Sequence, residues 1–160
     1  MGAMMGKPCH DGHMPLYCMV SSLLIWCAMD TKQLIDFWQR SGLEDIKTAE
    51  ALFAAKRYTA CLFFCHLFIE KMLKACYVAE IGDTPPLWHN LVRLAQKASL
   101  ELTEKQWDLL AEVNYFNIAG RYEDYQRDFY RISTRAYTKK YLVKSLELHA
   151  WLLEKLFRRV

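Results

Sequence analysis

The chain has 160 residues, which is long enough for one domain with a substantial hydrophobic core. Apolar residues make up 53% of it, and only 6 glycines and 4 prolines interrupt it, which is typical of a helical globular protein. The net charge of +3 is too small to indicate nucleic-acid binding by itself. The six cysteines form no CxxC pair, and in the body of the chain they indicate buried thiols in a reducing, cytoplasmic compartment.

Residues 1–28 differ in character from the rest of the chain and are expected to lie outside the helical fold. Within them, residues 16–28 form a mostly apolar run that is too short to span a membrane and lacks a good signal-peptide cleavage pattern. Cys9, His10 and His13 offer three possible metal donors without a fourth at suitable spacing. Chance explains these three residues better than a metal site does, so no metal is expected.

The first helix is predicted from Thr31 to Ala55. Asp30 or Thr31 can act as its N-cap, because both side chains can accept a hydrogen bond from the first turn. Met29, directly before them, looks like a natural start of the domain. We therefore expect the helical domain to occupy residues 29–158.

The fold is predicted to be built around the second helix. Its apolar stretch covers residues 58–78, and the helix is expected to end near Ile81. It contains no Gly or Pro, and apolar residues occupy nearly all of its sides. Such a helix is buried on several sides, either at the centre of a bundle or in a dimer interface. A tight turn at Lys56 and Arg57 predicts that it lies antiparallel to the first helix.

One polar line interrupts this apolar helix. His66, Glu70 and Lys74 are spaced four residues apart, so they lie along one side of it. Because an unpaired buried charge is costly, the line needs partners or water. Two interpretations remain open: an intrahelical pair between Glu70 and Lys74 at the edge of a groove, or a polar groove that faces a partner or ligand.

The remaining elements are also predicted to be helical. Gly82 and the prolines after it end the second helix. A short third helix is expected from Trp88 to Ala98, with His89 in a packing or capping role. A capping box at its start predicts a fourth helix over residues 103–117, and Thr134 is expected to cap the last helix. Short connections between long helices predict an all-α, up-and-down bundle of four to five helices.

The stretch Ile118–Asp128 breaks the helical periodicity and is predicted to be a loop. A guanidinium suits bidentate phosphate recognition, and aromatic rings can stack on bases, so this loop is a candidate ligand site. Its candidate residues are Arg121, Tyr122, Asp124 and Tyr125. The alternative is a loop without a ligand, in which Arg121 pairs with Glu123 or Asp124.

The sequence contains no glycine-rich phosphate loop, nucleophile elbow or metal-binding helix motif. Its basic residues crowd the last third of the chain, and such a run is most often a solvated helix face. These residues are Arg121, Arg127, Arg131, Arg135, Lys139, Lys140 and Lys144.

From Met29 to about Leu156 the chain resembles a prokaryotic HEPN-domain protein (higher eukaryotes and prokaryotes nucleotide-binding). The order and spacing of several segments carry the resemblance: Met29–Phe53, Arg57–Tyr58, Phe64–Lys74, Pro85–Ala95 and Asn114–Tyr125. The resemblance implies a compact bundle of four or five helices that forms a homodimer and needs no cofactor. It also implies a partner, a minimal nucleotidyltransferase, in a toxin–antitoxin-like pair.

Many HEPN proteins of such pairs are metal-independent RNases, whose signature is an Arg followed, after four to six residues, by a His. Arg121 matches the Arg, but Gln126, Arg127 and Asp128 stand where the His is required. The group that would transfer protons near neutral pH is therefore missing from the signature. The resemblance thus implies a nucleotide-, RNA- or partner-binding module. An RNase that combines Arg121 with a His from elsewhere and a purely structural interaction subunit are the alternatives.

Overall fold

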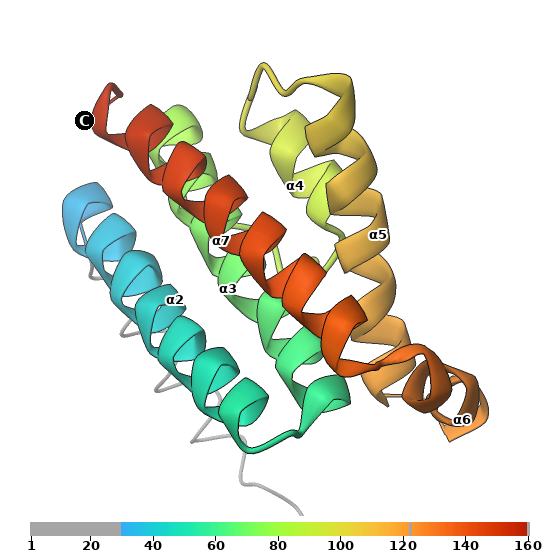
Figure 1. The fold of residues 1–160 in the computed structure, drawn as a ribbon. Coiled ribbons are helices and arrows are strands. Elements are labelled where there is room, and N and C mark those ends of the chain that lie inside the picture. Colours follow the sequence, from blue (N-terminus) through green and yellow to red (C-terminus); the bar gives the residue numbers. More distant parts are fainter. Residues whose placement is uncertain (1–29, 122, 160) are drawn as a thin grey trace, which may run out of the picture.

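The computed structural model describes residues 30–121 and 123–159, with side chains outside 119–127. In these residues the chain forms six α-helices and no strand (Figure 1). The helices are α2 (Thr31–Ala54), α3 (Tyr58–Ile81), α4 (Leu91–Lys97), α5 (Glu104–Arg121), α6 (Glu123–Ile132) and α7 (Arg135–Phe157). The predicted all-α bundle is confirmed, with one helix more than expected. Residues 1–28, including the three possible metal donors at their start, lie outside the described part.

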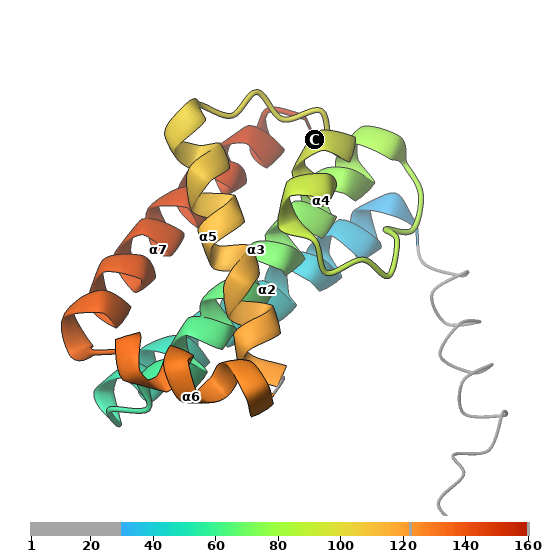
Figure 2. The same ribbon diagram turned by 90° about the vertical axis from the view of Figure 1, so that its right-hand side faces the viewer.

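Helix α3 lies at the centre of the fold, as its sequence predicts, and packs against α2, α4, α5 and α7. Residues Leu62, Phe68, Ile69 and Leu73 of α3 are completely buried. The four long helices alternate in direction, with α2 and α5 running opposite to α3 and α7 (Figure 1). Helix α6 lies across the end of the bundle at which α5 stops and α7 starts (Figure 2). None of the described helices is long and apolar enough to cross a membrane.

Capping residues set several helix boundaries where the sequence predicts them. The Asp30 carboxylate accepts the backbone N–H of Gln33 at 2.7 Å, and the Gln33 side chain accepts the N–H of Asp30 at 3.2 Å, which completes a capping box. Gly82 ends α3 in the left-handed region at φ 77°, where a residue with a Cβ is disfavoured. The Thr134 side chain accepts a backbone N–H of the first turn of α7.

Two further helix starts differ from the prediction. Helix α4 begins at Leu91 and not at Trp88, because the Asn90 side chain accepts a backbone N–H of the first turn and so acts as the N-cap. Before α5, the Gln106 side chain accepts from both the N–H and the hydroxyl of Thr103. The half of the predicted capping box in which the Gln106 side chain accepts the N–H of Thr103 is therefore formed. The other half is replaced, because the Thr103 hydroxyl donates to the Gln106 side chain and does not accept a backbone N–H.

Within the stretch Ile118–Asp128, residues 118–121 and 123–128 are helical, so the prediction of a loop is wrong for these residues. Helix α5 continues to Arg121, and α6 begins at Glu123. Phe129 of α6 is fully buried, and its ring centroid lies 5.6 Å from that of Phe116 on α5. A glycine inside a helix costs about 1 kcal/mol relative to alanine, and aromatic packing between α5 and α6 offsets that cost.

A chain that begins at Met29 is expected to keep the helicity and melting temperature of the full chain. Asp30 and Gln33 complete the cap of α2 without any residue before them. Circular dichroism and thermal melts of the two chains would test this expectation. A large fall in melting temperature would instead show that residues 1–28 pack into the fold.

Candidate functional site

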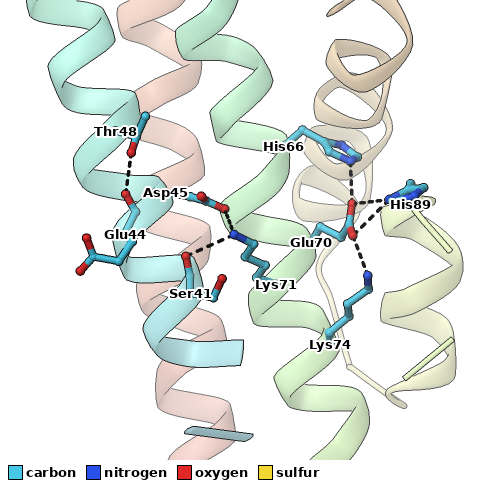
Figure 3. A network of polar contacts seen from close by, with 9 residues as sticks. All are labelled: Ser41, Glu44, Asp45, Thr48, His66, Glu70, Lys71, Lys74 and His89. Carbon is cyan, nitrogen blue, oxygen red and sulfur yellow. Dashed lines mark hydrogen bonds and ion pairs between the residues drawn. The ribbon is translucent and has the colours of Figure 1, made fainter. Parts of the chain in front are cut away.

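Glu70 is the centre of a buried polar cluster on one side of α3 (Figure 3). Its carboxylate accepts hydrogen bonds from His66 Nε2 at 3.1 Å, Lys74 Nζ at 2.7 Å and His89 Nδ1 at 3.0 Å. The side chains of Glu70 and Lys74 are each 6% exposed and that of His66 is fully buried, whereas that of His89 is 48% exposed. The three residues of the predicted polar line therefore lie together, and His89 closes the cluster toward solvent.

The cluster joins three parts of the fold. Lys74 Nζ lies 4.8 Å from the centroid of the Trp38 ring, so its charge also faces α2. His89 belongs to the segment between α3 and α4. The predicted intrahelical pair between Glu70 and Lys74 is present, and both side chains are almost completely buried. The hydrogen bond from His89 to Glu70 links this segment to α3.

The cluster keeps Glu70 ionised. Burial alone would raise the pKa of Glu70, but the hydrogen bonds from His66, Lys74 and His89, together with the charge of Lys74, outweigh burial and lower that pKa to about 2. An ionised carboxylate can only accept hydrogen bonds, so both histidines donate to it. A carboxylate with so low a pKa is poorly suited to general-base chemistry near neutral pH.

A second ion pair lies where α2 meets α3 (Figure 3). Lys71 Nζ is 2.5 Å from an Asp45 carboxylate oxygen and 3.4 Å from the Ser41 carbonyl oxygen, to which it donates. This pair was not predicted from the sequence. A signal was present, because Asp45 has helical spacing with Trp38 and Ala49 and so shares the buried face of α2.

The side chains of the candidate ligand residues Arg121, Tyr122, Asp124 and Tyr125 lie outside the described part of the chain. The backbone places Arg121 as the last residue of α5, and α6 begins two residues later. Exposed aromatic side chains occur on both sides of this junction, Tyr115 on α5 and Tyr130 on α6.

The three described histidines all contact residues of α3. His66 and His89 bind Glu70. His149 is buried on α7 with its ring edge-on to Phe68, and burial lowers its pKa. Neither α5 nor α6 contains a histidine.

The three cysteines of α3 are buried free thiols, as the sequence predicts: Cys61, Cys65 and Cys76. Burial raises the pKa of Cys76 to about 12, so that this thiol stays protonated. Among the described residues, no group of three His, Cys, Asp or Glu side chains is placed to hold a metal ion.

Comparison with known families gives one result that covers most of the chain. The family model described as the HEPN domain matches residues 35–156, from the first turns of α2 to the end of α7. Comparison with curated proteins and with solved structures gives no match. The helical bundle around α3 agrees with the family match, and the chain belongs to the HEPN-domain family.

Proposed function

We propose that this HEPN-domain protein is a cytoplasmic nucleotide- or RNA-binding module that contacts phosphate through Arg121. We further propose that it forms a homodimer and acts with a minimal nucleotidyltransferase in a toxin–antitoxin-like pair. The observation that carries the binding role is the place of Arg121. It ends α5 at a helix junction, and by the sequence resemblance it matches the Arg of the HEPN signature.

Two features favour binding over cleavage. Gln126, Arg127 and Asp128 occupy the positions of the signature His. The histidines that the structure describes are engaged at Glu70 or buried against Phe68. A guanidinium can hold a phosphate by charge and donor geometry alone, whereas strand cleavage also needs groups that transfer protons.

Replacement of Arg121 by alanine is expected to weaken the binding of nucleotide and RNA, and neither protein should cleave RNA. Filter binding at low and high salt and a nuclease assay on the same preparations measure both properties. Arg121→Lys should restore only part of the affinity, because an ammonium keeps the charge but loses the bidentate fork. Arg40→Ala, which removes an exposed guanidinium from α2, is the matched control.

Two outcomes would contradict this function. Robust RNA cleavage that Arg121→Ala abolishes would establish the RNase alternative. Unchanged binding in that variant would remove Arg121 from the site and favour a purely structural subunit. Light scattering of the purified protein, alone and with a nucleotidyltransferase encoded beside it, tests the proposed dimer and partner separately.

A further inference from the structure

One end of the bundle gathers exposed cations from separate parts of the chain. The α2–α3 turn, α6 and the start of α7 all lie at this end (Figures 1 and 2). We call its exposed cations the basic end; they are Lys56, Arg57, Arg131, Arg135 and Lys139. Residues 129–146, which contribute three of them, contain no Asp or Glu. The sequence alone indicated a solvated helix face here, but the fold adds the two cations of the α2–α3 turn.

The geometry of α7 divides its cations into two edges. Arg135 and Lys139 are four residues apart, so they lie one above the other along one edge of its outer face. Lys140 and Lys144 follow the opposite edge, beside the Tyr141 ring. Lys144 also lines a groove between α5 and α7, where Asp108, Glu112 and Glu147 outnumber the two lysines, Lys105 and Lys144. The edge of Arg135 and Lys139 is therefore the more strongly positive one.

Ion pairing varies among the surface cations, and exposed cations of other faces, such as Lys32, Arg40 and Lys97, also form no ion pair among the described side chains. Lys47, Arg158 and Arg159 each form an ion pair with a Glu. At the basic end only Arg131 pairs, with Asp128 at 3.7 Å, and both side chains are so exposed that the pair is weak. Among the described side chains, the other four cations of the basic end have no carboxylate partner. Their positive field is free to attract an anionic ligand.

An aromatic ring stands beside these cations. Tyr130 is 76% exposed on α6, directly before Arg131. A large aromatic side chain left in water at a positive surface is suited to stacking with a base. The cations are spread over the α2–α3 turn, α6 and α7, which suits a strand with several phosphates better than a single nucleotide.

We propose that the basic end binds the phosphates of single-stranded RNA, with Tyr130 as a stacking surface for one base. This inference rests on the proposed binding function and specifies its ligand as an extended strand. Arg121 would contact a single phosphate at the helix junction, and the basic end would bind the rest of the strand.

The test compares two charge-matched triple variants of the full chain. Arg131→Ala/Arg135→Ala/Lys139→Ala removes three charges from the basic end, and Lys32→Ala/Arg40→Ala/Lys47→Ala removes three exposed charges from α2. The probes are a mononucleotide and a single-stranded RNA of about twelve nucleotides, within the usual site size of about 4–16. Affinity is measured between about 50 and 200 mM salt, because each phosphate contact to a single strand contributes about −0.7 to the slope of log K against log salt.

The basic-end variant is expected to bind the RNA at least about tenfold more weakly and to reduce the magnitude of the salt slope by about 2. Its affinity for the mononucleotide should change little, whereas Arg121→Ala should weaken the binding of both the mononucleotide and the RNA. The proposed function and this inference can therefore fail separately. Tyr130→Ala should weaken RNA binding, and Tyr130→Phe, which keeps the ring, should not.

Three results would overturn the inference. Equal losses in the two triple variants would show that only net charge matters. Equal binding of duplex and single-stranded RNA would remove the role of Tyr130 in stacking. Binding of phosphatidylserine vesicles, lost in the basic-end variant while RNA binding persists, would identify the basic end as a membrane-contacting surface. All three side chains of the basic-end variant are exposed, so its melting temperature should match that of the wild type.

Discussion

Replacement of Glu70 by glutamine is expected to lower the free energy of unfolding by roughly 3–5 kcal/mol, the usual result of removing one partner from a buried ion pair. The substitution leaves the ammonium of Lys74 in the interior without its counter-charge, and the side chain of Lys74 is only 6% exposed. It also weakens the hydrogen bond that His89 makes with α3. Urea unfolding at neutral pH measures the loss.

The matched control is Glu154→Gln. Glu154 of α7 pairs with Arg158, the C-cap residue four positions later, which is the same spacing as Glu70 and Lys74, but both side chains of this pair are largely exposed. A surface pair of this kind contributes about 0–1 kcal/mol, so this variant should stay close to the wild type. Equal losses in the two variants would show that burial of the Glu70 cluster does not determine its contribution.

The pH dependence of the unfolding free energy tests the contribution of Glu70 independently. The pKa of Glu70 is lowered from 4.5 to about 2, so its contribution is fully present above pH 4.5 and is lost as the pH falls through this interval. The corresponding loss is at most about 3 kcal/mol. The Glu70→Gln variant has no carboxyl to protonate at this position. Its unfolding free energy should therefore fall less steeply than that of the wild type over the same interval.

Replacement of Leu62 by alanine is expected to cost roughly 2–5 kcal/mol of unfolding free energy, the range for a large-to-small change in a packed core. Leu62 is completely buried on α3, whereas Leu87, between α3 and α4, is 84% exposed. Leu87→Ala therefore makes the same chemical change outside the core and should be nearly neutral. Ile69→Ala, also fully buried on α3, should resemble Leu62→Ala. A near-zero effect at Leu62 would contradict the central place of α3.

The sequence predicts much of this fold because local signals fix its helices. Asp30 and Thr134 are capping residues next to apolar periodicity, and Gly82 can adopt the backbone that ends α3. Helix α6 escaped prediction because its stability depends on distant contacts. Its fully buried aromatic residue, Phe129, packs against Phe116 of α5, and no local pattern reveals that contact.

The polar cluster is predictable only in part, for the same reason. The spacing of His66, Glu70 and Lys74 places them on one side of α3, which the structure bears out. That side could face a ligand or the protein itself, and the answer depends on the segment after α3. His89 supplies a partner from within the protein, because it bonds to Glu70 across nineteen positions of sequence.

The three-residue turn between α2 and α3 affects how the chain folds while it is being synthesised. These two helices can pair as soon as both leave the ribosome, because closing so short a connection costs little entropy. The side of α3 that faces α7 is covered later in synthesis, because Cys76 contacts Leu152, which lies 76 residues further along the chain. At typical rates of synthesis this apolar side stays uncovered for on the order of ten seconds. Nascent chains of this protein therefore pass through a stage at which chaperones have a surface to bind.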